Sequence, residues 1–232
     1  MSATATLVLL IVGAYLMGGI PFGLLVGWVK GIDVRTAGSR NIGATNVSRL
    51  LGRPYGVLVF ALDVLKGLVP TVIAGSVLIG LGGREGPPEA VRYLCWLAIG
   101  IACVLGHNYP VYLGFRGGKG VSTSLGVTLG VYPDLTIPGL AAFGIWVIVV
   151  ATSRYISVGS VAAGVAFPIL FLVIARYRGR SVIDECWPLL AFSVLLGVLV
   201  VVRHRANLGR LLAGTESKIG RRPMEQMRKG AP

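Results

Sequence analysis

Long runs of apolar residues, separated by short polar or Gly/Pro-rich stretches, dominate this chain. Seven runs cover roughly residues 4–29, 55–81, 90–106, 118–132, 135–153, 156–175 and 186–202. A helix needs about 20 predominantly apolar residues, with a range of about 17 to 25, to cross the hydrocarbon core of a bilayer. Six of the seven runs reach this range. The pattern therefore predicts an all-α membrane protein, a bundle of seven transmembrane helices.

The run at 118–132 is the shortest, because its helix would be about 22 Å long against a core of about 30 Å. If this run crosses the membrane, most Lys and Arg residues lie on one side, in segments 30–54, 107–117 and 203–232 and at Arg154. If this run instead forms a re-entrant segment that leaves the membrane on the side where it entered, the basic C-terminal segment and the first loop lie on opposite sides of the membrane. Since basic loops favour the cytoplasmic side, we expect seven spans with the N-terminus outside and the C-terminus in the cytoplasm.

The composition adds a strong positive charge to this picture. Of the 232 residues, 54% are hydrophobic and 13% are charged, and the formal net charge is +13. The basic residues are dispersed among hydrophobic segments, so we interpret them as a rim that meets anionic membrane lipids and phosphorylated solutes. Nucleic acid is a poor partner for such a pattern. We expect one transmembrane domain at 1–212 and a basic cytoplasmic tail at 213–232.

Two polar, glycine-rich stretches, GSRNIGATN at 38–46 and HNYPVYLGFRGGKGVST at 107–123, interrupt the apolar pattern. Polar groups at a hydrocarbon boundary are costly unless they bind something, and glycine lets backbone amides approach a ligand closely. The candidate binding residues are Gly38, Ser39, Asn41, Gly43, Thr45, Asn46 and Arg49 in and beside the first stretch, and His107, Arg116, Gly117, Gly118, Lys119, Gly120, Ser122 and Thr123 in the second. This chemistry predicts a bound phosphate, although a capped helix terminus would equally explain the Ser and Asn residues of the first stretch.

Three further groups of polar residues lie inside or beside the predicted spans. Asp63 and Lys66 are three residues apart within one run, so they can pair on one helical face, either as a structural or as a catalytic pair. The turn at 152–160 offers Ser157 and Ser160. The end of the last run carries Arg203, His204, Asn207 and Arg210, which we expect to share one helical face.

In this order, the segments GSRNIGATN, LDVLKG, GHNYPVYLGFRGGKGVST, RYISVGS and RHRANLGRLLAGTESKIG span nearly the whole chain. Together they resemble the PlsY family of bacterial membrane acyltransferases, the acyl-phosphate:glycerol-3-phosphate acyltransferases. Arg40 stands where that family often has Gly. The resemblance implies a small bundle of seven transmembrane helices in the bacterial cytoplasmic (inner) membrane, with its active site facing the cytoplasm.

The resemblance also implies a reaction. A fatty acyl group passes from acyl phosphate to the 1-position of glycerol 3-phosphate, giving lysophosphatidate and inorganic phosphate in the first acylation step of phospholipid synthesis. No metal or other cofactor is implied, and functional coupling to the enzyme that makes acyl phosphate is expected. The implied catalytic residues are Ser39, Arg49, Lys119, His204 and Asn207. Either His204 or a phosphate oxygen of the donor would accept the hydroxyl proton.

Other classes of membrane protein or acyltransferase fit these residues less well. A soluble-type acyltransferase uses a histidine with an aspartate five positions on, but His107 is followed at that spacing by Tyr112 and His204 by Gly209. An organic-phosphate or anion transporter is the competing interpretation, because polar loops at broken helices also mark transport sites. Against transport, the polar stretches lie on one predicted side, and no inverted repeat is detectable in the sequence.

Overall fold

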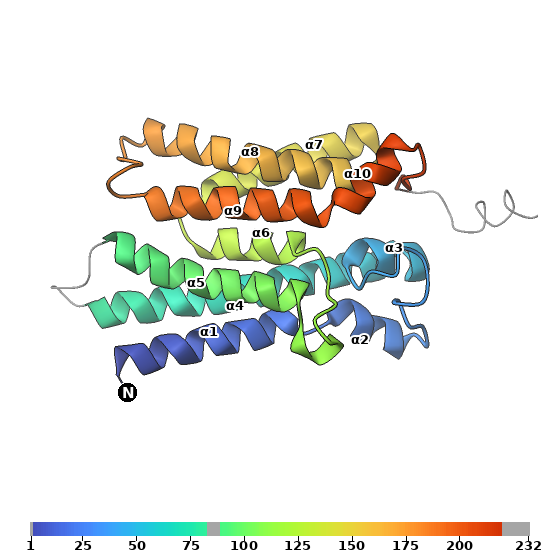
Figure 1. Ribbon diagram of the computed structural model, residues 1–232, viewed down its shortest axis with the longest axis horizontal. Helices are drawn as coiled ribbons and strands as arrows, with labels where there is room; N and C mark the ends of the chain where they lie inside the picture. The colour runs from blue at the N-terminus through green and yellow to red at the C-terminus, as the bar shows by residue number, and fades with distance from the viewer. Residues whose placement is uncertain (1, 83–88, 220–232) are drawn as a thin grey trace, which may run out of the picture.

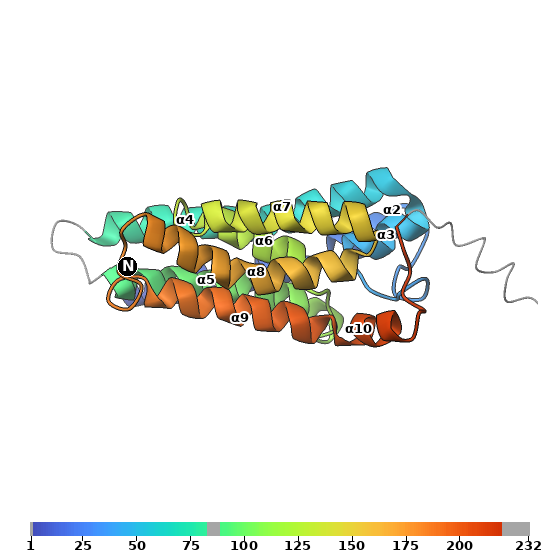
Figure 2. The same cartoon turned by 90° about the horizontal axis from the view of Figure 1, so that it is seen from above.

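The computed structural model describes residues 2–82 and 89–219, and within these ranges every regular element is helical (Figures 1 and 2). The α-helices are α1 (Ala3–Gly19), α2 (Phe22–Val29), α3 (Ala44–Leu51), α4 (Arg53–Gly82), α5 (Glu89–Asn108), α6 (Val121–Gly130), α7 (Thr136–Ser153), α8 (Ile156–Tyr177), α9 (Trp187–Arg203) and α10 (Arg205–Leu212), with a short 3₁₀ helix, η1, at Val111–Leu113. The all-α class expected from the apolar pattern is confirmed.

The number of helices that could span a membrane by length and composition is five to six in the described residues. The five are Ala3–Val29, Arg53–Leu78, Glu89–Leu113, Thr136–Ser153 and Ile156–Tyr177, and α9 with α10 forms a sixth that is bent by 51°. The remaining predicted span, 118–132, appears as α6, whose 10 residues extend only about 15 Å. This helix is shorter than expected because the glycine-rich loop continues to Gly120 and a turn begins after Gly130.

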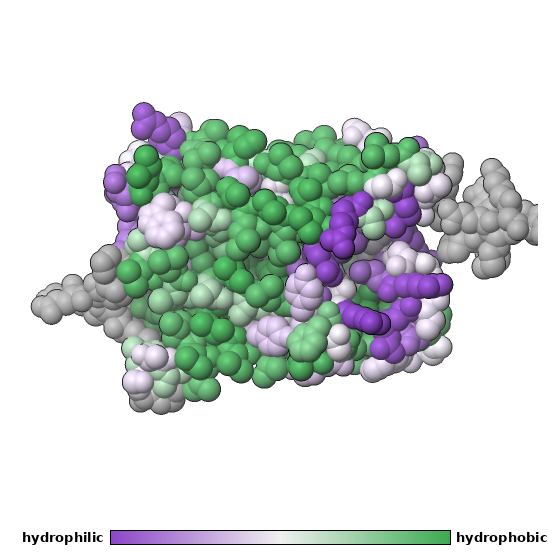
Figure 3. Space-filling view, viewed as in Figure 1, coloured by the Kyte–Doolittle hydropathy of each residue, from purple (hydrophilic) through white to green (hydrophobic). Residues whose placement is uncertain are grey.

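The long helices form two layers with α6 between them (Figure 1). The first layer contains α1, α4 and α5, and the second contains α7, α8 and α9, while α6 packs on α4, α5 and α7. The α4–α6 contact is close because a Cβ atom at Gly126 would overlap the carbonyl oxygen of Val64. Apolar residues cover the middle of the surface and hydrophilic residues gather at its two ends (Figure 3), as a membrane-embedded bundle requires.

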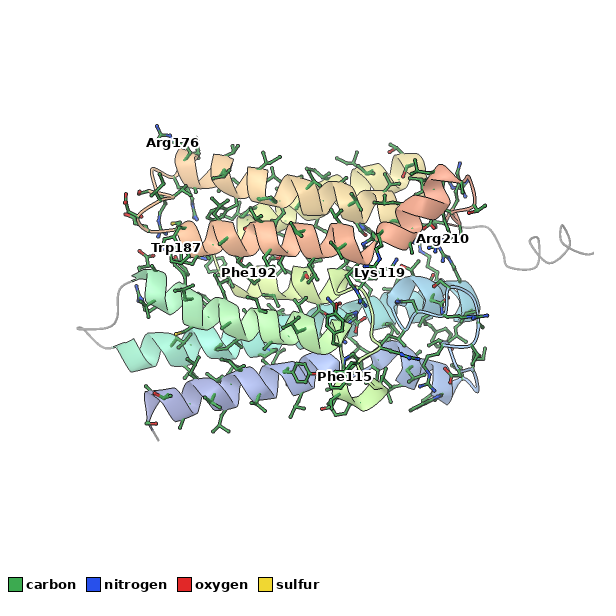
Figure 4. All side chains as sticks on the ribbon, viewed as in Figure 1. Phe115, Lys119, Arg176, Trp187, Phe192 and Arg210 are labelled. Carbon is green, nitrogen blue, oxygen red and sulfur yellow. The ribbon has the colours of Figure 1, made fainter. Side chains whose placement is uncertain are left out.

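An ion-pair cluster joins three segments at one end of the bundle. Arg180, which follows α8, contacts Glu89 at the start of α5 at 2.7 Å and Asp134 in the α6–α7 turn at 3.3 Å. Tyr93 of α5 donates a hydrogen bond of 2.6 Å to the same Asp134. Figure 4 shows Arg176 and Trp187 at this end and Lys119 toward the other. The turn after α6 therefore lies at the end opposite the glycine-rich loop.

The C-terminal helix corrects one expectation from the sequence. We expected Arg203, His204, Asn207 and Arg210 to share one face of a continuous helix, but the chain bends by 51° between α9 and α10. His204 stands at the break, so Arg203 ends one helix while Asn207 and Arg210 belong to the next. The bend, rather than a common helical face, brings these residues toward one site.

Candidate active site

A cavity of about 330 Å³ lies between the two layers, at the end of the bundle that carries the glycine-rich loop. Its polar walls come from the first loop, α3, the segment before α6, the start of α8 and α10, and its apolar walls come from α6, α7 and α8. The lining includes all five side chains that the sequence resemblance implied to be catalytic: Ser39, Arg49, Lys119, His204 and Asn207. Residues more than 160 positions apart therefore meet at one site.

The structure separates the other candidate residues into two groups. Those that line the cavity are Asn41, Gly43, Thr45, Asn46, Asp63, His107, Gly120, Ser122, Ser157 and Ser160. Those that do not line it are Gly38, Lys66, Arg116, Gly117, Gly118 and Thr123. Arg116 is exposed on the loop surface. The two glycine amides instead make internal bonds, from Gly117 N to Asn108 O at 3.1 Å and from Gly118 N to His107 O at 3.0 Å.

The glycine-rich loop is held rigidly beneath Lys119. A Cβ atom at Gly118 would overlap the imidazole ring of His107, so only glycine fits this position. From α9, Arg203 donates a hydrogen bond to the carbonyl oxygen of Gly118, and its guanidinium lies 5.2 Å from the centre of the Tyr109 ring. These contacts fix the backbone from which the Lys119 side chain enters the cavity.

Beneath the loop lies a buried ion pair. Asp63 and Lys66 are in contact at 2.8 Å, as their spacing allowed, and Lys66 also donates a hydrogen bond of 2.8 Å to the carbonyl oxygen of Ile20. Asp63 lies 3.8 Å from Nδ1 of His107, the residue on which Gly118 packs. The pair therefore supports the glycine-rich loop and ties it to the break between α1 and α2.

A hydrogen-bonded chain connects Lys119 to the end of the described chain. The ammonium group of Lys119 donates a hydrogen bond to Oδ1 of Asn207. Nδ2 of Asn207 in turn donates a hydrogen bond of 2.6 Å to Oε1 of Glu216. Ser157 donates to the same carboxylate at 3.0 Å, and Nε of Arg210 donates to Oε2 at 2.9 Å. Burial lowers the pKa of Lys119 to about 8. Burial opposes the charge on Glu216, but the hydrogen bonds from Asn207, Ser157 and Arg210 outweigh it and lower the pKa of that carboxyl.

Glu216 was not among the residues predicted from the sequence. The sequence assigned it to a basic cytoplasmic tail, yet Glu216 lines the cavity. Arg49 donates to the carbonyl oxygen of Ser217 at 3.3 Å, and Arg154 exchanges hydrogen bonds of 3.0 and 2.8 Å with Ile219. The one signal in the sequence was that Glu216 is one of only two acidic residues, with Glu225, in the basic ending of the chain.

His204 has a defined tautomer at the junction of α9 and α10. Its Nδ1 lies 2.8 Å from the carbonyl oxygen of Val200, and because a carbonyl only accepts, Nδ1 carries the hydrogen. The other ring nitrogen, Nε2, therefore keeps its lone pair in the neutral ring. The imidazole lines the cavity and is 2% exposed. This geometry suits a group that accepts a proton or a hydrogen bond from a ligand hydroxyl.

Asn46 organises the first polar stretch. Its Nδ2 donates to the carbonyl oxygen of Val34 at 2.9 Å, and its Oδ1 accepts from the backbone N–H of Ser39 at 2.8 Å. The amide thus folds the loop back onto α3 and holds Ser39 at the cavity wall. The alternative considered from the sequence, helix capping, is replaced by this longer-range contact, because α3 has Gly43 at its N-cap with no side-chain hydrogen bond.

Within residues 2–82 and 89–219, no three His, Cys, Asp or Glu side chains gather where they could hold a metal ion. The groups available to a ligand at the polar end are cations, hydroxyls, amides and the imidazole rings of His107 and His204. Arg49, Lys119, Arg203 and Arg210 face the cavity against two carboxylates, those of Asp63 and Glu216. This excess of positive charge suits an anionic ligand such as a phosphate ester.

The chain matches the family model described as glycerol-3-phosphate acyltransferase over residues 8–214. The glycerol-3-phosphate acyltransferase of Geotalea daltonii is 44% identical to it over 211 residues, covering 90% of this chain and 96% of that protein. The protein of the same name from Aquifex aeolicus is 40% identical, covering 90% of this chain and 97% of its own length. This chain belongs to the glycerol-3-phosphate acyltransferase family.

Solved structures agree with this membership. A crystal structure of PlsY (YgiH), an integral membrane glycerol 3-phosphate acyltransferase, in its glycerol 3-phosphate form aligns with a TM-score of 0.77 at 38% identity, covering 96% of this chain and 98% of that one. The lysophosphatidic acid form of PlsY aligns with a TM-score of 0.75 at 38% identity, covering 93% and 96%. The family expected from the motifs is confirmed, and the chain is a multi-pass membrane protein.

Proposed function

We propose that the protein transfers a fatty acyl group from acyl phosphate to the 1-hydroxyl group of glycerol 3-phosphate. The products would be lysophosphatidate and inorganic phosphate, and the reaction would be the first acylation step of bacterial phospholipid synthesis. One observation carries this proposal: a single cavity is cationic at one end and apolar at the other. A donor with a phosphate head and an acyl chain, together with a small phosphorylated acceptor, matches both ends.

The cationic end has enough groups to hold two phosphates. Lys119 enters from the glycine-rich loop, whereas Arg49 enters from α3 beside Ser39. Charge-assisted hydrogen bonds from such groups are roughly twice as strong as neutral ones. We assign Ser39, Arg49 and Lys119 to phosphate binding, and His204 and Asn207 to orienting the reacting groups.

The chemistry needs positioning and charge neutralisation more than a protein nucleophile, because acyl phosphate is a mixed anhydride with a good leaving group. The 1-hydroxyl oxygen attacks the acyl carbonyl carbon and forms the ester bond. The bond from that carbon to the phosphate oxygen breaks, and phosphate leaves with its electron pair. The hydroxyl proton passes to Nε2 of His204 or to an oxygen of the leaving phosphate. Replacing His204 by Gln would separate these two routes through the pH profile of kcat.

The same proposal includes the topology. We propose seven crossings, with α6 and the α6–α7 turn together forming the fourth, the N-terminus outside and the C-terminus in the cytoplasm. The ion pair between Arg180 and Asp134 supports this arrangement, since it lies at the end opposite Lys119. The cavity would then face the cytoplasm of a bacterial inner-membrane protein, where phosphorylated substrates and the enzyme that makes acyl phosphate are available.

The test is phosphate release by purified protein in lipid. We expect release only when acyl phosphate and glycerol 3-phosphate are both present, with lysophosphatidate accumulating in equal amount. Phosphate release at the same rate without glycerol 3-phosphate would mean that the protein only hydrolyses acyl phosphate. Passage of glycerol 3-phosphate across sealed vesicles without acyl transfer would favour an organic-phosphate transporter.

A further inference from the structure

The apolar end of the cavity is a chamber lined mainly by α6, α7 and α8, with Phe60 of α4 and Val200 of α9 also in its lining. Its walls contain Leu125 and Thr128 of α6, Gly139 and Ala142 of α7, and Phe167 of α8. Helices α6 and α8 both pack on α7 (Figure 2). The lining residues of α7 extend from Gly139 to Trp146, so the chamber follows this part of the helix. These residues carry few polar atoms, and the chamber continues directly from the polar end. Under the proposed function, on which this inference rests, the chamber would receive the acyl chain.

The depth of the chamber follows from the lining residues of α8. The polar mouth begins at Ser157 and the last lining residue of this helix is Phe167, ten positions farther along. Ten residues of α-helix extend about 15 Å. A bilayer core is about 30 Å thick, so the chamber ends at about the middle of the membrane. An acyl chain longer than the chamber has to bend, leave sideways or push the end wall aside.

Two large buried side chains of α8 mark the deep end of the lining. Phe167 is 5% exposed, and one helical turn beyond it Phe171 is 2% exposed and does not line the cavity. On the opposite side, α6 and α7 touch, because a Cβ atom at Gly139 would lie 2.8 Å from Oγ1 of Thr128. Phe167 therefore separates the chamber from the packed core behind it.

We propose that Phe167 is the floor of the acyl-chain chamber and that Phe167 and Ala142 set the longest acyl chain that the enzyme uses efficiently. Ala142 is buried in the chamber wall, so its small side chain keeps the chamber wide. Its neighbour Ala141 is exposed on the outside of α7. The length preference thus depends on two side chains that touch neither the phosphate groups nor the reacting atoms.

The experiment measures kcat/KM for a series of saturated acyl phosphates that differ by two methylene groups, with the purified protein in lipid. Phe167→Ala should open the chamber toward Phe171 and move the preferred length to longer chains. Each methylene that gains burial should raise kcat/KM by about fourfold relative to wild type. Ala142→Leu should move the optimum to shorter chains and reduce kcat/KM for the longest donor by at least about tenfold.

Two matched variants control for general damage to the bundle. Phe171→Ala removes an aromatic ring from the same face of α8 but leaves the floor in place, so the length profile should not change. Ala141→Leu adds the same bulk as Ala142→Leu on the membrane-facing side, and its profile should match that of the wild type. If Phe167→Ala does not fold, the pair Ala142→Leu and Ala141→Leu still decides the question.

The outcomes distinguish this inference from the proposed function. Wild-type activity with an unchanged length optimum in both Phe167→Ala and Ala142→Leu would overturn the inference and leave the acyltransferase assignment standing. A shift of equal size in Phe171→Ala or Ala141→Leu would also overturn it, because the change would then reflect loosened packing. Wild-type protein that transfers no acyl group from any donor of the series would instead refute the proposed function.

Discussion

Replacing Lys119 by Met removes one charge from the polar end of the cavity while keeping a similar side-chain length. Lys119 is the cation of the glycine-rich loop that reaches into the cavity, and its ammonium contacts Oδ1 of Asn207. A hydrogen bond to a charged group contributes about 1.5 to 3 kcal/mol. Losing one such contact with a substrate phosphate should lower kcat/KM roughly tenfold to a hundredfold. The loss should be larger if the contact strengthens in the transition state.

The assay is steady-state phosphate release by the Lys119→Met protein in lipid, with the thermal midpoint measured on the same preparation. Arg116→Met is the matched control, because Arg116 lies on the same loop but is exposed outside the cavity. It should keep kcat/KM within about twofold of the wild type. Lys119→Arg should keep only part of the activity, since the planar guanidinium group of arginine does not replace the compact ammonium group of lysine. A folded Lys119→Met protein with full activity would refute the assignment of the glycine-rich loop to phosphate binding.

Four further results are expected. Because burial lowers the pKa of Lys119 to about 8, the ammonium loses its charge as pH rises through that value; kcat/KM should therefore fall above about pH 8, and a flat profile to higher pH would contradict this. Glu216→Ala should reduce kcat/KM roughly tenfold by freeing the Asn207 amide, whereas Glu216→Gln, which keeps an acceptor, should lose less; equal losses would argue that only the charge matters. Asp63→Asn should lower the thermal midpoint, because removing one partner of a buried ion pair costs about 3 to 5 kcal/mol and leaves Lys66 unpaired; an unchanged midpoint would count against its supporting role. Acyl phosphate should be used in excess chelator and acyl thioesters should not, and equal rates with a thioester would remove the donor assignment.

The pattern of apolar and polar residues along the chain was enough to predict the class of fold and most helix positions. The runs at 135–153 and 156–175 correspond closely to α7 and α8, because long apolar segments leave the chain few alternatives to a membrane helix. The run at 118–132 was predicted too long. Its first residues belong to a loop whose shape depends on the contact between Gly118 and His107, which is a tertiary contact that periodicity does not report.

The candidate site was predictable where residue types were distinctive. Lys119, Arg49 and His204 stood out as polar residues beside apolar runs, and the cavity collects all three. Glu216 was missed because its role depends on a return of the chain after α10 that brings it to Asn207 and Ser157. Arg116 was included because it lies two residues before Gly118, although the loop turns its side chain to the exterior. Spacing along the chain cannot give these directions without the surrounding packing.

The central claim is that one cavity joins the two substrates by acyl transfer. The most direct measurement follows isotopically labelled glycerol 3-phosphate added outside sealed vesicles that contain the purified protein and acyl phosphate. The account predicts that the label appears in the membrane as lysophosphatidate, in amounts equal to the phosphate released and only when acyl phosphate is present. Label that accumulates as free glycerol 3-phosphate inside the vesicles, with none in lipid, would contradict the account.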